Sequence, residues 1–168
     1  MKIVLTGAPG SGKTTVWQWL KQYFKDAYFV PEAARHLLNR NSYQFPKDIV
    51  KFQLDILKLQ LYWESKIPSN VPFVFFDRGI WDGLAYYPLA PLANLKHSGY
   101  DLILLIEPIF VKPKELRSER EKETLLIHER IRFAYLAKGY DPIPIPKRPV
   151  DLRCKIIKEI IEKNKKED

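Results

Sequence analysis

The sequence predicts an α/β fold built on a mostly parallel β-sheet. Short apolar runs alternate along the chain with longer segments that carry apolar residues every three or four positions. Strands that alternate with helices in this way are typical of parallel sheets. The chain has 168 residues, of which 46% are hydrophobic, and this is enough for one domain with its own core. Because no linker or internal repeat is visible, we expect a single domain over residues 1–168.

Five apolar runs are the strand candidates. They span residues 2–6, 27–30, 73–76, 101–106 and 142–145. The last run contains two prolines and is followed by a third, so we expect it at an edge of the sheet, where a missing N–H donor costs least.

Helices are expected between and after these strands. Residues 13–25, 32–39 and 48–64 have helical patterns, and the third is the clearest, because its apolar residues recur every three or four positions. Ser118 and Glu121 form a Ser-x-x-Glu capping box, which opens a helix that ends near Gly139. Asp151 is placed to cap a final helix, and residues 162–168 are expected to form a solvated, frayed tail.

Composition excludes several classes of protein. A single cysteine, Cys154, rules out an internal disulfide framework, and with only three histidines a zinc site of paired Cys and His is not expected. No apolar run is long enough to span a membrane, and the N-terminus becomes glycine-rich too early for a signal peptide, so we expect a cytoplasmic protein. The net charge of +8 favours anionic partners such as nucleotides. A homo-oligomer is left open.

The segment Gly7–Thr14, GAPGSGKT, matches the phosphate-binding pattern G-x-x-x-x-G-K-[ST], the P-loop. Its glycines allow consecutive backbone N–H groups to converge on an anion, and the helix that follows adds its positive N-terminal end. Lys13 supplies a charge for the β- and γ-phosphates, and the Thr14 hydroxyl is a ligand for Mg²⁺. The strand before this segment and the helix after it favour a nucleotide site over an ordinary glycine-rich turn. The residues expected to contact ATP here are Gly7, Pro9, Gly10, Ser11, Gly12, Lys13, Thr14 and Thr15.

Charged residues follow two other strand candidates at the same predicted edge of the sheet. Glu32 and Arg35 come after the second strand, and Asp77 and Arg78 come after the third. Ligands of open parallel sheets bind outside the carboxyl ends of the strands, so these four side chains are candidates for catalysis. One carboxylate can hold Mg²⁺, for which Asp77 is the candidate, while the other receives a proton from the acceptor; which of the two is the base stays open.

Each of these residues also has a structural interpretation. Glu32 could stabilise the N-terminus of its helix, Arg35 could pair with Glu32, and Arg78 could be only the partner of Asp77. Trp81 could stack on an acceptor ring or pack in the core, and Asp82 could hydrogen-bond a sugar or base. Phe52 and Gln53 on the long helix are further candidates for the same cleft.

The motifs GAPGSGKTT, VPEAAR, FFDRGIWDGLAYY and YDLILLIEP together resemble a small P-loop ATPase/kinase family labelled as an AAA-type domain. This family is related to the ribosylnicotinamide kinase domain of the bifunctional NAD-biosynthesis regulator. The resemblance covers nearly the whole chain. It implies a three-layer α/β/α sandwich with a five-stranded parallel sheet of order 2-3-1-4-5. It also implies that Glu32 serves as base or acceptor ligand, and that Asp77 and Arg78 match the family's acid–arginine pair.

The resemblance further implies a lid over the phosphates at about residues 112–122, with Arg117 and Arg120 as its arginines. Without the resemblance, the highly charged stretch 112–123 would be interpreted as a solvated loop and helix start. Arg148 follows the last strand candidate, where kinase-like folds seat the adenine ring, and a guanidinium can stack on such a base.

The leading hypothesis is therefore a Mg²⁺–ATP-dependent kinase that acts on a nucleoside, nucleotide or related metabolite. The arginines Arg35 and Arg78 favour an acceptor that already carries phosphate. Two alternatives stay open, namely an NTP-hydrolysing switch that acts through a protein partner, and a nucleic-acid-binding protein that uses ATP. A kinase needs a deep acceptor cleft beside the P-loop, which a switch does not.

Overall fold

The computed structural model describes residues 1–40, 42–87, 95–97, 99–109 and 119–165. Five strands in this part of the chain form one sheet with the order β2-β3-β1-β4-β5, and every pair of neighbours is parallel. The strands are β1 (Lys2–Thr6), β2 (Tyr28–Val30), β3 (Val74–Asp77), β4 (Leu102–Ile106) and β5 (Ile143–Ile145). The expected sheet order is confirmed.

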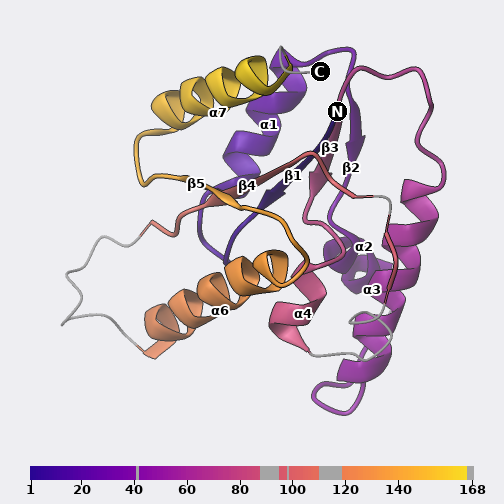
Figure 1. Cartoon of the computed structure of the whole chain (residues 1–168). Helices are drawn as coiled ribbons and strands as arrows, with labels where there is room; N and C mark the ends of the chain where they lie inside the picture. Colours follow the sequence, from indigo (N-terminus) through magenta and orange to yellow (C-terminus); the bar gives the residue numbers. More distant parts are fainter. Residues whose placement is uncertain (41, 88–94, 98, 110–118, 166–168) are drawn as a thin grey trace.

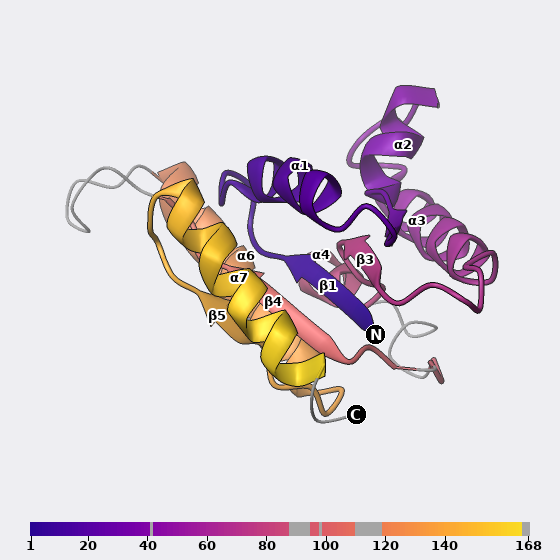
Figure 2. The ribbon, with the colours of Figure 1, turned by 90° about the horizontal axis from the view of Figure 1, so that it is seen from above.

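Helices cover both faces of this sheet and make it the middle of three layers (Figure 1). Their bounds are α1 (Lys13–Tyr23), α2 (Ala33–Arg40), α3 (Ile49–Glu64), α4 (Asp82–Tyr86), α6 (Glu119–Leu136) and α7 (Val150–Lys165). Figure 2 shows α1 and α7 together on one side of the strands, while α2 lies beside α3.

The core is divided by the sheet into two apolar clusters. Alternate residues of β1 point to opposite faces, as the period of a strand requires, so Val4 joins one cluster and Ile3 and Leu5 join the other. The first cluster packs against α3, α4 and α6, and the second against α1 and α7. Because β1, β3 and β4 contribute to both clusters, the two halves of the core share their central strands.

The parallel arrangement brings the carboxyl ends of all five strands to one edge of the sheet. The loop from β1 to α1, the start of α2 and the β3–α4 loop therefore meet at this edge (Figure 1). The functional residues expected after the first three strands lie in these segments or directly beside them, as Asp77 does at the end of β3.

Strand bounds agree with the expected runs to within one residue, and the helices differ at their ends. Asp77 is the last residue of β3 and does not follow the strand. α7 begins at Val150, so Asp151 lies in its first turn, where its charge still favours the helix N-terminus, and is not the cap. α7 continues to Lys165, so the expected frayed tail is wrong for residues 162–165. Ser118 lies outside the described residues.

Among the residues that the structure describes, no helix is both long and apolar enough to cross a bilayer.

Candidate active site

The β1–α1 loop has the backbone of a phosphate-binding loop. Gly7, Gly10 and Gly12 have φ angles of 140°, 73° and 84°, a region that side-chain-bearing residues rarely adopt. At Gly7 a side chain is also excluded by space, because a Cβ atom would lie 2.4 Å from the carbonyl oxygen of Ile106. Gly12 precedes α1 and offers no side-chain cap, so the first N–H groups of this helix stay available to an anion.

Lys13 is held across this loop. Its Nζ donates hydrogen bonds to the carbonyl oxygen of Gly7 at 2.8 Å and to that of Ala8 at 3.2 Å. Burial, together with the nearby positive charge of Arg78, lowers the pKa of Lys13 to about 8. A bound phosphate group would supply a negatively charged partner for this buried ammonium group.

Arg153 supports the same loop from α7, although the side chain was not expected at the site. Its guanidinium donates to the carbonyl oxygen of Ser11 at 2.7 Å and to that of Glu107 at 3.1 Å, and the residue is buried. These bonds connect α7 to the P-loop and to the end of β4. A signal was present in the sequence, because Arg153 lies four residues before Ile157 and eight before Ile161 on the apolar face of its helix.

Thr14 and Asp77 line a cavity of about 480 Å³ above the P-loop, together with Lys13. Within the described residues, the Asp77 carboxylate makes no hydrogen bond or ion pair, and burial together with the nearby Glu32 raises its pKa to about 6. A buried carboxylate without a direct partner beside a hydroxyl group fits a cation. No group of three or more metal-ligating side chains occurs in the described part of the chain. Mg²⁺ in nucleotide sites needs no such group, since phosphate and water supply its other ligands.

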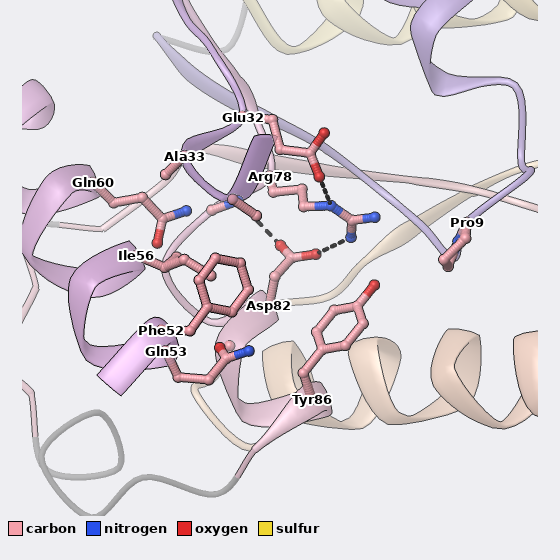
Figure 3. A pocket seen from close by; sticks show the side chains of 13 residues that line it. Pro9, Glu32, Ala33, Phe52, Gln53, Ile56, Gln60, Arg78, Asp82 and Tyr86 are labelled. Carbon is pink, nitrogen blue, oxygen red and sulfur yellow. Dashed lines mark hydrogen bonds and ion pairs between the residues drawn. The ribbon is translucent and has the colours of Figure 1, made fainter. Parts of the chain in front are cut away.

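Arg78 lies between two carboxylates. Its Nε donates to Glu32 Oε1 at 3.0 Å, and one terminal nitrogen donates to Asp82 Oδ1 at 3.1 Å (Figure 3). Although burial opposes its charge, Asp82, Tyr86 and Glu32 raise the pKa of Arg78 above its usual value. Arg78 is therefore a fixed cation, already paired on two sides.

Asp82 is the centre of the network around Arg78. Besides the arginine, its carboxylate accepts hydrogen bonds from the Thr6 hydroxyl at 2.5 Å, the Gly79 backbone N–H at 3.0 Å and the Tyr135 hydroxyl at 2.7 Å. The four donors come from β1, the β3–α4 loop and α6. They occupy both carboxylate oxygens, so the position of Asp82 suits holding the loop in place rather than binding a sugar or base.

A second cavity, of about 210 Å³, adjoins the P-loop cavity. It is part apolar and part polar, and both cavities are bounded by Pro9, Glu32 and Arg78. We call it the acceptor cavity. Figure 3 shows α3 side chains on one side of it and Arg78, Asp82 and Tyr86 on the other. Its lining consists of Pro9, Glu32, Ala33, Ala34, Phe52, Gln53, Ile56, Gln60, Arg78, Gly79, Asp82, Gly83 and Tyr86.

The sequence alone did not indicate how far along α3 this cavity extends. Phe52 and Gln53 were candidates, but Ile56 and Gln60 were missed. Ile56 lies four residues after Phe52, and Gln60 lies seven residues after Gln53, so all four side chains share one face of the helix. This spacing could have identified Ile56 and Gln60 from the sequence.

Other expected site residues lie elsewhere. Trp81 is 3% exposed in the core cluster and lines neither cavity, so its position supports packing and not substrate contact. Arg35 lines the P-loop cavity, and its exposed side chain pairs with the Glu32 carboxylate at 3.4 Å. Arg120, in the first turn of α6, and Arg148, between β5 and α7, are exposed and line neither cavity, and the same holds for Thr15. Arg117 and most of the expected lid lie outside the described residues.

Several solved kinase structures share this fold. Deoxyadenosine kinase from M. mycoides superimposes with a TM-score of 0.68 at 15% identity, over 97% of this chain and 100% of that one. Thymidylate kinase from Ehrlichia chaffeensis gives 0.64 at 15% identity, over 96% and 98% of the two chains. Thymidylate kinase from Candida albicans gives 0.64 at 17% identity, over 99% and 93%. The chain therefore has the P-loop fold of nucleoside and nucleotide kinases.

The chain also matches a sequence model of a protein family. The model described as "AAA domain" matches residues 2–153, which is most of the chain, and the protein belongs to this family. A comparison with curated proteins found no match. The family match confirms the resemblance inferred from the P-loop and the motifs that follow it.

Proposed function

We propose that this chain is a phosphotransferase that moves the γ-phosphoryl group of Mg²⁺–ATP to a nucleoside, nucleotide or related small molecule. One observation carries this proposal: a phosphate-loop cavity and a part-apolar cavity adjoin and share Glu32 and Arg78. A donor and an acceptor bound in the two cavities would meet at this shared wall. A hydrolysing switch needs no second cavity of this kind, and the kinase neighbours in structure point in the same direction.

The P-loop binds the triphosphate of the donor. Backbone N–H groups of the loop and the N-terminus of α1 face the phosphates, and Lys13 adds a positive charge close to the group that is transferred. Thr14 and Asp77 are the residues that would hold Mg²⁺, and when bound this ion neutralises charge on the phosphate oxygens.

The acceptor reacts from the other cavity. Its hydroxyl oxygen forms a bond to the γ-phosphorus, the bond from that phosphorus to the β,γ-bridging oxygen breaks, and ADP leaves. The hydroxyl proton passes to Glu32, which is the only carboxylate among the described residues that lines both cavities. Asp77 lines only the P-loop cavity of the two, and the Asp82 carboxylate is occupied by four donors. Arg78 lies at the same wall and offsets negative charge in the transition state.

The test is ADP release from Mg²⁺–ATP with and without a panel of nucleosides, mononucleotides and sugar phosphates, with identification of the product by mass. We expect at least one acceptor to stimulate ADP release and to appear as its phosphorylated form. Lys13→Ala should abolish transfer, while Lys25→Ala, an exposed lysine outside the loop, should leave it unchanged. Acceptor-independent hydrolysis across the whole panel would overturn the proposal in favour of a switch that acts through a protein partner.

A further inference from the structure

The charged groups of the acceptor cavity leave no free positive charge for a phosphate. Three charged side chains line it, namely the carboxylates of Glu32 and Asp82 and the guanidinium of Arg78. Both carboxylates already pair with Arg78. Among the described residues that line this cavity there is no lysine or histidine and no second arginine. The fixed charge of the lining is therefore close to −1.

Arg35, the other arginine expected near the acceptor, pairs with Glu32 at 3.4 Å, but its side chain is exposed and lies outside this cavity. It lines the P-loop cavity and a polar cavity on the far side of Glu32, but not the acceptor cavity. A phosphate monoester carries between one and two negative charges at neutral pH. Seating it beside Glu32 and Asp82 would add like-charge repulsion in a half-enclosed site, where such repulsion is stronger than in water.

The neutral part of the same cavity is built for a flat, polar ring. Phe52 and Ile56 of α3 and Tyr86 of α4 form apolar walls (Figure 3). The side chains of Gln53 and Gln60 line the same cavity, and each residue is only 7% exposed. Neither amide has a hydrogen-bond partner in the part of the chain that the structure describes. Amides that face a cavity without protein partners are available to hydrogen-bond a bound molecule in place of water.

We infer that the acceptor is a nucleoside and not its monophosphate: an uncharged hydroxyl compound whose planar base lies along Phe52 with its polar edge towards Gln53 and Gln60. This inference rests on the proposed phosphotransfer and refines it. The base edge satisfies the two amides, and the sugar hydroxyl lies towards Glu32. Arg78 stays paired with its two carboxylates, so it offers no unpaired positive charge to a phosphate already on the acceptor.

The experiment compares matched pairs, thymidine with thymidine monophosphate, cytidine with cytidine monophosphate, and adenosine with adenosine monophosphate. Each is offered with Mg²⁺–ATP to the 168-residue chain, and the phosphorylated product is quantified. We expect kcat/KM for at least one nucleoside to exceed that for its monophosphate by tenfold or more. Preferential phosphorylation of a monophosphate or of a sugar phosphate would overturn this inference but leave the proposed phosphotransfer intact. Hydrolysis without any phosphorylated acceptor would overturn both.

Binding variants test the roles of the lining without relying on turnover. Gln53→Leu and Gln60→Leu should each weaken binding of the preferred nucleoside by about tenfold, measured by calorimetry, since each removes hydrogen bonds to the base. Gln44→Leu is the matched control, because Gln44 is exposed and lies outside the cavity. Glu32→Gln removes one negative charge and should narrow the difference in affinity between nucleoside and monophosphate. The inference would be contradicted if Gln53→Leu and Gln60→Leu both left nucleoside affinity unchanged. It would also be contradicted if Glu32→Gln left the difference in affinity between nucleoside and monophosphate unchanged.

Discussion

Arg78 has a φ angle of 73°, a left-handed conformation that costs a residue with a side chain about 1–2 kcal/mol. The surrounding contacts hold it there. The backbone N–H of Arg78 donates to the carbonyl oxygen of Leu5 at 3.1 Å, and the guanidinium group is bound by Glu32 and Asp82. The strained turn directs this side chain to the wall between the two cavities. Backbone strain of this kind is common at functional sites, where the surrounding structure compensates for it.

The role of Glu32 as base leads to a prediction about turnover. Glu32→Gln keeps the shape of the side chain but cannot accept the hydroxyl proton, so kcat should fall by about 100-fold or more. Affinity for Mg²⁺–ATP should change little, because the P-loop is untouched. Steady-state kinetics and calorimetry of the same preparation separate the two effects. A variant that loses thermal stability but keeps its kcat would show that Glu32 acts only as a helix acid and as a partner of Arg78.

The shifted pKa values of Asp77 and Lys13 predict a bell-shaped dependence of kcat/KM on pH. Asp77, with a pKa of about 6, must be ionised to bind Mg²⁺, and Lys13, with a pKa of about 8, must be protonated to bind phosphate. We therefore expect kcat/KM for Mg²⁺–ATP to rise through pH 6 and fall through pH 8, because this parameter reports the free enzyme. A flat profile between pH 5 and pH 9 would exclude these two groups as determinants.

The same two pKa shifts make the stability of the unliganded protein depend on pH in the opposite direction to kcat/KM. Folding raises the pKa of Asp77 from 3.8, so the folded state binds more protons between pH 3.8 and about 6, and this residue makes stability fall as pH rises there. Folding lowers the pKa of Lys13 from 10.5, so its contribution to stability rises between about pH 8 and 10.5. Denaturant titrations of Asp77→Asn and Lys13→Met should lose these respective slopes.

At the scale of elements, helices on opposite faces of the sheet position the site. α7 holds the P-loop through Arg153, and α6 holds Asp82 through Tyr135. α3 supplies one face to the acceptor cavity and another to the core, where Leu57 packs. Glycine at position 79 is required by this packing, since a Cβ atom there would lie 2.6 Å from the Tyr135 hydroxyl.

Removal of the Arg153 guanidinium should affect the P-loop from a distance. Arg153→Met leaves the buried carbonyl oxygen of Ser11 and the part-buried one of Glu107 without the Arg153 donor, which costs about 1–3 kcal/mol of unfolding free energy. It should also raise KM for Mg²⁺–ATP more than it lowers kcat, because the loop that binds phosphate loses its support. Lys155→Met, on the exposed side of α7, is the matched control. Unchanged KM together with lowered stability would restrict Arg153 to a structural role.

At the scale of the whole molecule, the two core clusters are coupled by the strands they share. β1, β3 and β4 contribute to both, so neither half of the core can open without exposing the other. We therefore predict one cooperative unfolding transition for residues 1–168, with coincident midpoints from circular dichroism and tryptophan fluorescence. Trp17 and Trp81 report on opposite clusters. Two separate midpoints would contradict the single domain.

A bound nucleotide should shift this transition upwards. Mg²⁺–ATP binds only the folded P-loop, so the midpoint should rise with its concentration by mass action. Lys13→Ala should remove most of the rise. A rise that is the same in this variant would show that the nucleotide binds elsewhere.

The P-loop, the order of strands and helices, and the membership of the family could all be predicted from the sequence. Each depends on residues close together in the chain: the spacing of glycines around Lys13, the alternation of apolar runs, and the motifs that carry Glu32, Asp77 and Arg78. Local spacing also allowed these side chains to be placed at one edge of a parallel sheet, since every strand there ends on the same side.

The contacts of these side chains follow from the packing of the folded chain. It places Trp81 in the core, pairs Arg78 with two carboxylates, brings Arg153 to a loop 142 residues earlier in the chain, and extends the acceptor cavity to Gln60. Such contacts join segments that are distant in sequence, and they depend on how α3, α6 and α7 pack on the sheet. For this reason the charge balance of the acceptor cavity, on which our inference of a nucleoside acceptor rests, could not be derived from the sequence, where the arginines alone favoured a phosphorylated acceptor.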